Sequence, residues 1–226
     1  MARFSSHFDT PPAEYERGRA GHLQRRRVEV ILRAIDSYGA KVIAELGCGT
    51  GAVLRAVASQ RPLLDLDGFD IDRGLLDFAA EAASHLPNVA VARADVGRDV
   101  LPRRYDLVFS IDTIHHLHDH QVAFRSIRAN LNPSGTWLAI EPNIWHPYIT
   151  LQQERMRRAG LDEDHFRPWR LLPLLEAAGF RTTSRRYLHA LPGGIDRVPR
   201  PVARLERLVE RLPAVGASVV LELTAT

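Results

Sequence analysis

The sequence predicts an α/β fold with a doubly wound, mainly parallel sheet of seven strands and helices on both faces. Short apolar runs of strand length alternate with amphipathic helical runs along most of the 226 residues. That alternation is typical of parallel strands joined by right-handed helical crossovers. The first apolar run ends in a loop with glycine at every second position, and a helical run follows at once. With 45% apolar residues, the chain has enough hydrophobic side chains for one large core.

The chain begins with a helical segment that precedes the first strand. Residues 14–38 are predicted to form one long helix or a broken pair, because apolar residues recur on one face of a helix and Gly39 follows as a stop signal. The seven strands are then expected at 41–46, 65–70, 88–93, 105–110, 135–140, 181–188 and 217–224.

Helices are expected between these strands, at 51–60, 73–84, 119–131, 168–178 and 201–211. Asp72 and Asp119 stand where N-caps of the second and third of these helices would lie. After the fifth strand the pattern loosens, and residues 142–167, with a short arginine-rich helix, are interpreted as an insertion over the active site. In an open sheet of this kind, ligands bind beyond the carboxyl ends of the strands.

The glycine loop is the clearest ligand-binding signal. Without Cβ atoms a loop lets a ligand lie against the backbone, and the following helix directs N–H groups at it. An adenosine-type cofactor is therefore expected. Gly47, Gly49 and Ala52 fit a loose G-x-G-x-x-G pattern, and Asp70 stands where a dinucleotide site has its ribose acid. By itself the loop leaves the choice of cofactor open.

Two details favour a cofactor other than a dinucleotide. Glu45 lies two residues before the first glycine, where a carboxylate suits a cationic ligand better than a pyrophosphate. Gly51 stands where a dinucleotide loop needs no glycine. The segment Glu-Leu-Gly-Cys-Gly-Thr-Gly at 45–51 resembles motif I of the class I S-adenosylmethionine-dependent methyltransferases.

Further segments resemble that family in its order and spacing. Segments 68–72, 93–96 and 105–110 belong to the ends of the second and third strands and to the fourth strand. Segment 114–117 forms the loop after the fourth strand, 131–136 precedes the fifth, and 174–180 precedes the sixth. In the turn before strand five, Ser134 replaces the usual first glycine. The match spans about 38–188, and five motifs in register are stronger evidence than motif I alone.

The resemblance implies how the chain is organised. Residues 41–226 would form a Rossmann-like, S-adenosylmethionine-binding catalytic domain, and residues 1–40 a helical lid that closes over the cofactor, with Tyr15 and Arg19 facing it. Asp70 would hold the ribose hydroxyls and Asp95 the adenine amino group. The other implied cofactor-binding residues are Glu45, Gly47, Cys48, Gly49, Gly51, Ile71, Val96 and Ser110.

Four of these residues have plainer alternatives. Asp70 could simply cap the next helix. Asp95 is also a common kind of turn residue. Glu45 could only brace the glycine loop through backbone N–H groups. Cys48 is expected to fill space in the loop and not to act as a nucleophile.

The catalytic candidates are His115, His116 and Glu141. A sulfonium methyl is already activated, so an enzyme must align the acceptor, exclude water and often remove a proton. Histidine suits that last task near neutral pH. His115 occupies a loop position that faces the substrate in similar methyltransferases, although it could simply line the pocket. His116 is expected to point the other way, as a buried, hydrogen-bonded histidine, and Glu141 could cap a loop.

The run of histidines at 115–120 also invites a metal interpretation. Adjacent positions at a strand-to-helix turn cannot all converge on one ion, and structural zinc sites favour cysteine, of which Cys48 is the single example. No metal is therefore expected.

Composition limits location and partners. One cysteine rules out an internal disulfide and fits a reducing cytoplasm. No signal segment and no apolar run of membrane-spanning length is present in the sequence. A formal net charge of +3 is too small to imply a nucleic-acid partner, although the isoelectric point is 9.4. We expect a monomer or homodimer that binds a small-molecule acceptor.

The function expected from the resemblance is S-adenosylmethionine-dependent methyl transfer to a small molecule of secondary or cofactor metabolism. The acceptor atom, oxygen, nitrogen or carbon, stays open. The alternative is a protein that binds another adenosine ligand, either an NAD(P)-dependent Rossmann oxidoreductase or a non-catalytic binding protein.

Overall fold

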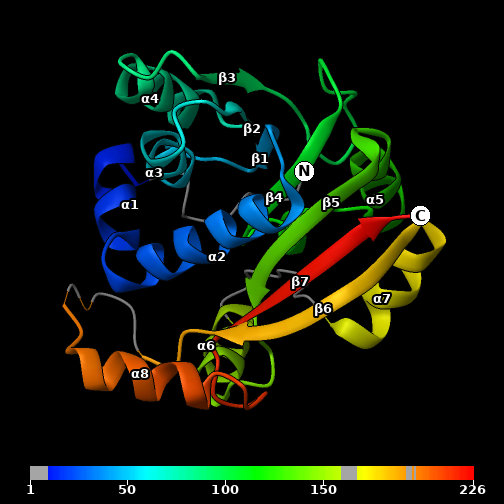
Figure 1. The fold of residues 1–226 in the computed structure, drawn as a ribbon. Helices are drawn as coiled ribbons and strands as arrows, with labels where there is room; N and C mark the ends of the chain where they lie inside the picture. The colour runs from blue at the N-terminus through cyan, green and yellow to red at the C-terminus, as the bar shows by residue number, and fades with distance from the viewer. Residues whose placement is uncertain (1–9, 159–166, 192–194, 196) are drawn as a thin grey trace.

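The computed structural model describes residues 10–158, 167–191, 195 and 197–226, and its centre is a seven-stranded sheet (Figure 1). The strands are β1 (Val42–Leu46), β2 (Asp65–Asp70), β3 (Val89–Arg93), β4 (Tyr105–Ile111), β5 (Leu131–Pro142), β6 (Phe180–Leu188) and β7 (Ser218–Ala225). Their order across the sheet is β3-β2-β1-β4-β5-β7-β6. Only β7 runs antiparallel to its neighbours, so the predicted doubly wound, mainly parallel sheet is confirmed.

The helices lie where the sequence pattern placed them. Their bounds are α1 (Pro12–Arg19), α2 (His22–Tyr38), α3 (Ala52–Gln60), α4 (Arg73–Ala83), α5 (His120–Ala129), α6 (Pro147–Arg158), α7 (Pro168–Ala177) and α8 (Arg200–Val209), with a short 3-10 turn, η2, at Ile114–His116. The predicted caps are confirmed. The Asp72 carboxylate accepts the Leu75 N–H at the start of α4, and Asp119 accepts the Val122 N–H at the start of α5.

The N-terminal segment is a broken pair of helices. Gly21 separates α1 from α2 with φ at +97°, a value that glycine adopts without strain. Gly39 ends α2 in the left-handed conformation, as predicted. Of the expected lid, residues 1–9 lie outside the described residues, as do residues 159–166 of the expected insertion.

The core consists of two apolar layers, one on each face of the sheet. On one face α2 and α3 pack on the strands, and on the other α5 and α7 do so (Figure 1). The central strand β4 supplies both layers, because successive side chains point to opposite faces. Leu107 and Phe109 join the α2–α3 layer, and Val108 joins the α5–α7 layer, all fully buried.

Strand β5 is longer than predicted. The turn expected before it, 131–136, lies inside β5. There the pairing of β5 with β4 shifts register, because Leu131 pairs with Tyr105 and Thr136 with Leu107. Gly135 is needed there, since a Cβ would approach the Tyr105 carbonyl oxygen to 2.9 Å. The sequence indicated the bend but not that both sides of it pair with the same strand.

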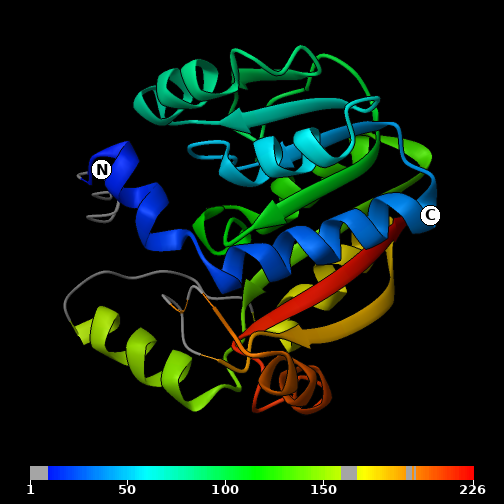
Figure 2. The ribbon, with the colours of Figure 1, turned by 60° about the vertical axis from the view of Figure 1, so that its left-hand side comes forward.

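The carboxyl ends of the parallel strands meet at one edge of the sheet. Figure 2 shows that α1 (blue) and α6 (yellow-green) lie at this edge. Helix α1 is beyond the ends of β1 to β4, and α6 is beyond the part of the sheet that contains β5, β7 and β6. Among the described residues, no helix has the length and apolar character needed to cross a membrane.

Candidate active site

A cavity of about 1020 Å³ opens at the carboxyl edge of the sheet. The end of β4 divides it. Residues that follow β1, β2 and β3 line one part, which we call the glycine-loop half. Residues that follow β5 and β6, precede β7 or lie on α6 line the other part together with Arg27 of α2, and we call this part the distal half.

The glycine loop needs glycine for steric reasons. Gly47, Gly49 and Gly51 have φ of +69°, +53° and +68° in the left-handed region. At Gly47 a Cβ would lie 2.6 Å from the Oγ1 atom of Thr113, so the loop after β1 and the loop after β4 touch. This contact holds the two loops at one end of the cavity.

Asp70 braces the glycine loop from the end of β2. Its Oδ2 accepts the Gly49 N–H at 2.7 Å, and its Oδ1 accepts the Asp72 N–H at 2.9 Å. Burial raises the pKa of Asp70, although these backbone N–H groups oppose the rise. Asp70 lines the cavity, so the residue expected to bind ribose also organises the loop.

Glu45 and Cys48 lie deep in the glycine-loop half. Glu45 is 3% exposed, and among the described residues its Oε2 has no hydrogen-bond partner. Burial raises the pKa of Glu45 well above its usual value, against the lowering effect of the Leu54 backbone N–H. Burial also raises the pKa of Cys48 well above the usual range, which keeps the side chain a thiol and disfavours a nucleophilic role.

The other predicted cofactor residues divide into two groups. Ile71, Asp95 and Val96 line the cavity. Asp95 also closes a turn, since its Oδ1 accepts the Gly97 N–H at 3.0 Å. Ser110 is not among the lining residues. It is 1% exposed, and its Oγ accepts the indole N–H of Trp137 at 3.1 Å, so it helps to hold β4 and β5 together.

Glu141 and His115 form a buried hydrogen-bonded pair. Oε1 of Glu141 accepts the backbone N–H groups of Thr113 and Ile114 at 2.9 and 2.8 Å. Oε2 lies 2.8 Å from Nδ1 of His115. A carboxylate only accepts, so Nδ1 carries the proton of this hydrogen bond. Glu141 is fully buried and does not line the cavity, whereas His115 does.

The expected orientation of His116 is wrong. His116 is exposed and lines the cavity beside His115, with ring centroids 4.1 Å apart and ring planes tilted by 45°. The 3-10 turn η2 is the physical reason, because it turns successive side chains by about a third of a revolution and not to opposite sides. Among the described residues, no group of three or more potential ligands is arranged to hold a metal ion.

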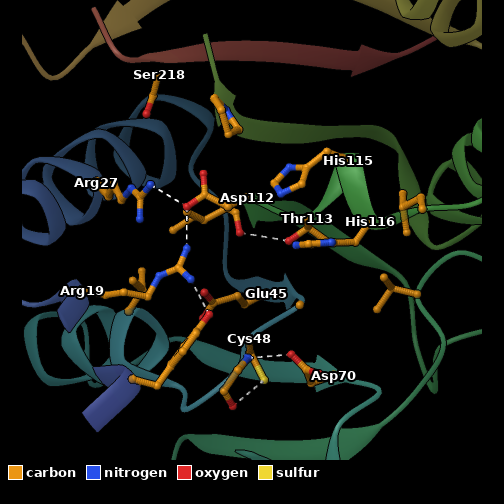
Figure 3. Close-up of a pocket in the computed structure, with 18 of the residues that line it drawn as sticks. Arg19, Arg27, Glu45, Cys48, Asp70, Asp112, Thr113, His115, His116 and Ser218 are labelled. Carbon is orange, nitrogen blue, oxygen red and sulfur yellow. Dashed lines mark hydrogen bonds and ion pairs between the residues drawn. The ribbon is translucent and has the colours of Figure 1, made fainter. Parts of the chain in front are cut away.

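Asp112 joins the N-terminal helices to the centre of the site. Arg19 and Arg27 both point at this residue (Figure 3), with nitrogen–oxygen distances of 2.6 and 2.7 Å to its Oδ2. Burial raises the pKa of Asp112, but the attraction of Arg27 and Arg19 outweighs burial and holds that pKa well below the usual range. Arg19 donates a hydrogen bond to the Tyr15 hydroxyl, and the Tyr15 ring lies against the glycine loop. Tyr15 and Arg19 line the cavity, as expected.

The sequence interpretation missed Asp112, Arg27 and His189. Asp112 and His189 each follow the end of a strand, so the rule that picked out Asp70 could have found them. Arg27 lies four residues from both Leu23 and Ile31, and an arginine within an apolar helical stripe is a signal of burial with a partner. Indeed Arg27 is 7% exposed.

Comparison with known sequences gives consistent results. A family profile described as "Methyltransferase domain" matches residues 44–137. Trans-aconitate 2-methyltransferase of Klebsiella pneumoniae (strain 342) is 30% identical over 144 residues, which cover 63% of this chain and 55% of that protein. The same enzyme of Escherichia coli O139:H28 is 29% identical over 136 residues, covering 60% and 52%. The matched segment thus spans about half the length of these curated relatives.

Solved structures share the fold. The N-methyltransferase NodS from Bradyrhizobium japonicum WM9, in complex with S-adenosyl-l-homocysteine, superposes with a TM-score of 0.67 at 14% identity, covering 96% of both chains. A SAM-dependent methyltransferase from Aquifex aeolicus gives 0.65 at 15% identity, covering 96% of this chain and 100% of the other.

Proposed function

Because the chain belongs to the class I S-adenosylmethionine-dependent methyltransferase family, we propose that it transfers a methyl group from this cofactor to a small-molecule acceptor. One observation carries the proposal. The glycine loop, braced by Asp70, and the imidazole of His115, held by Glu141, line the same cavity at the ends of neighbouring strands β1, β2 and β4. This arrangement supports a cofactor site and a proton acceptor that share one space.

The residues of the glycine-loop half fit the cofactor. Asp70 offers carboxylate oxygens for the ribose hydroxyls and Asp95 one for the adenine amino group. Glu45 supplies a buried carboxyl oxygen without a partner among the described residues, suited to a cationic ligand. Bound S-adenosylmethionine would supply a methyl group that is already activated by its positively charged sulfur. The task of the chain is therefore to align the acceptor and to exclude water.

We assign the proton-accepting role to His115. Glu141 is a positioning residue, since it fixes the tautomer of His115 and anchors the loop through Thr113 and Ile114. The backbone amides that Glu141 accepts hold the imidazole at the carboxyl end of β4. Arg19, Arg27 and Asp112 tie α1 and α2 to the same strand end, which would let the N-terminal segment 1–40 close over the cofactor as a lid.

The acceptor is proposed to be a small molecule of secondary or cofactor metabolism. Relatives named for trans-aconitate methylation support a small acceptor. The buried thiol of Cys48 suits a reducing cytoplasm.

Calorimetry separates this proposal from an NAD(P)-dependent function. The protein is titrated with S-adenosylmethionine, S-adenosylhomocysteine and NAD under identical conditions. We expect the first two to bind and NAD not to bind. Binding of NAD alone would overturn the proposal, and binding of none of the three would favour a role without an adenosine ligand. Release of S-adenosylhomocysteine in a panel of acceptors then identifies the acceptor class.

A further inference from the structure

The distal half of the cavity contains buried polar atoms that the fold itself does not satisfy. Among the described residues, five such atoms on its lining have no hydrogen-bond partner: both ring nitrogens of His189, Nε of Arg27, Nε2 of Gln153 and Nδ1 of His146. In the glycine-loop half, the single comparable atom in the described part of the chain is Oε2 of Glu45. Buried polar groups are normally paired, so a cluster of unpaired ones at a cavity wall indicates a ligand.

His189 is the most unusual member of this cluster. It is 1% exposed and has φ at +66°, a left-handed conformation that few residues other than glycine adopt. Its backbone is fixed on both sides. The His189 N–H donates to Oε1 of Glu210 at 2.8 Å, and its carbonyl accepts the Ala217 N–H at 2.8 Å. Glu210 is itself ion-paired with Arg26 at 2.6 Å.

The fold therefore holds an imidazole in a strained position, and among the described residues neither of its nitrogens has a hydrogen-bond partner. Strain of this kind is retained mainly at functional sites. A packing role alone would be served by an apolar side chain of similar size without the cost of burying two polar atoms.

Charged groups of both signs act on His189: Arg27 and Arg26 oppose protonation of its imidazole, whereas Asp112 favours it. Burial lowers the pKa of His189 to about 2, and the nearby Arg27 adds to that effect, so the imidazole is neutral. A neutral imidazole offers one N–H donor and one acceptor. Arg19 and Arg27 share the single carboxylate of Asp112, which leaves this group of three with a net charge of +1.

We propose that the distal half is a carboxylate-binding subsite for the methyl acceptor, with Arg27 and His189 as its specificity-determining residues. The Nε–H of Arg27 and the imidazole N–H of His189 donate to the carboxylate oxygens, and Gln153 adds an amide donor from α6. A carboxylate accepts from both donors, and its negative charge complements the net charge of +1 on Arg19, Arg27 and Asp112. This inference rests on the proposed methyl transfer.

The position of the subsite determines which part of the acceptor reacts. His189 follows β6, whereas His115 and Asp112, the partner of Arg27, follow β4, which β5 and β7 separate from β6. A carboxylate held between Arg27 and His189 therefore lies on the β6 side of Asp112, and the reacting group of the acceptor must extend from there toward the His115 imidazole. The acceptor class is accordingly a small molecule with one anchoring carboxylate and a second nucleophilic group nearer β4.

Binding of a matched pair of probes tests the subsite. Propane-1,2,3-tricarboxylate and its triamide share a carbon skeleton and differ in charge. Each is titrated into the full-length protein saturated with S-adenosylhomocysteine, with calorimetry or ligand-observed NMR as the readout. We expect the tricarboxylate to bind at least tenfold more tightly than the triamide. Equal affinities, or no binding of either probe, would overturn the subsite.

Two variants locate the effect. His189→Gly suits the left-handed backbone and removes the imidazole, and Arg27→Gln removes the charge but keeps an amide. Each should weaken tricarboxylate binding at least tenfold. His189→Gly, whose position has no part in the proposed lid, should also change the dissociation constant of S-adenosylhomocysteine less than threefold. His85→Ala and Arg181→Gln, at exposed positions away from the cavity, are the matched controls and should bind as the unmodified protein does.

The two proposals fail in different ways. If S-adenosylhomocysteine binds but the tricarboxylate does not, the subsite is wrong and methyl transfer stands. If His189→Gly and Arg27→Gln bind the tricarboxylate as the controls do, the assignment to these residues is wrong. If the tricarboxylate binds without any affinity for S-adenosylhomocysteine, the methyl-transfer proposal is wrong.

Discussion

Replacement of Asp70 by alanine gives the sharpest test of the cofactor site. The carboxylate has two oxygens, which accept the N–H groups of Gly49 and Asp72 and, in the proposal, two ribose hydroxyls. A hydrogen bond to a charged group contributes about 1.5–3 kcal/mol to binding. Both oxygens already serve backbone donors, and water replaces part of what is lost, so the net effect is smaller than the sum. We expect the dissociation constant of S-adenosylhomocysteine to rise at least tenfold, about 1.4 kcal/mol.

Asp72 provides a matched control two residues away. Its carboxylate caps α4 through the Leu75 N–H at 2.9 Å. Asp72→Ala should therefore lower the free energy of unfolding by about 1 kcal/mol and leave the affinity for S-adenosylhomocysteine within threefold. Asp70→Asn keeps one carbonyl acceptor but loses the charge, and its affinity should fall between those of the unmodified protein and Asp70→Ala.

Calorimetry at pH 7.5 measures the affinities, and urea unfolding measures the stabilities. An Asp70→Ala dissociation constant within threefold of the unmodified value would refute the ribose assignment. If Asp72→Ala weakened binding as much as Asp70→Ala, the effect would come from a general disturbance of this segment. The assignment of Asp70 to the ribose would then be refuted as well.

Three further predictions concern catalysis, the lid and pH. With an acceptor identified by the panel, His115→Ala and Glu141→Gln should lower kcat by about 10²- to 10⁴-fold and shift S-adenosylhomocysteine affinity less than threefold; more than a third of the turnover remaining would rule out a proton-accepting role. S-adenosylhomocysteine should slow limited proteolysis within residues 1–40, and equal rates would contradict closure of a lid. The pKa of His189 is about 2 in the fold, below about 6.5 in an unfolded chain, so its contribution to stability is complete above pH 6.5 and is lost as pH falls toward 2. Between pH 7 and 5.5 the protein should lose about 1 kcal/mol more than His189→Gly does in urea unfolding, and equal losses would show that His189 is not buried as a neutral imidazole.

The features that sequence predicted well are local ones. The caps at Asp72 and Asp119, the stop at Gly39 and the strand before the glycine loop each depend on a few neighbouring residues. Strand alternation with helices was enough to give the sheet. Asp70 could be placed because the end of a parallel strand fixes which edge a residue occupies.

The features that sequence did not give depend on contacts between distant segments. Asp112 meets Arg19 and Arg27 across 93 and 85 residues of sequence, and nothing near Asp112 indicates those partners. The pairing of Glu141 with His115 needed the register of β5 against β4, which an internal bulge shifts. The sequence spacing placed Glu141 and His115 at strand ends. It could not show that the Glu141 carboxylate lies beneath the His115 side chain and does not line the cavity.

The distribution of backbone strain supports a division of labour within the cavity. In the part of the chain that the structure describes, Asp112 and His189 are the non-glycine residues with φ in the left-handed region, and both line the cavity. One lies at the carboxyl end of β4 and the other at that of β6, so they stand at the two ends of the distal half. Glycine would relieve the strain at either position. The chain instead has an acid that binds two arginines and an imidazole whose nitrogens have no partner among the described residues. The buried layers around β4 and β5 can stabilise the fold against that cost, because strained residues persist where surrounding packing determines their conformation. The glycine-loop half, in contrast, is shaped by glycines that need no such support. We infer that the glycine-loop half relies on an unstrained loop. In the distal half, strained residues lower the stability of the fold and provide specificity for the acceptor.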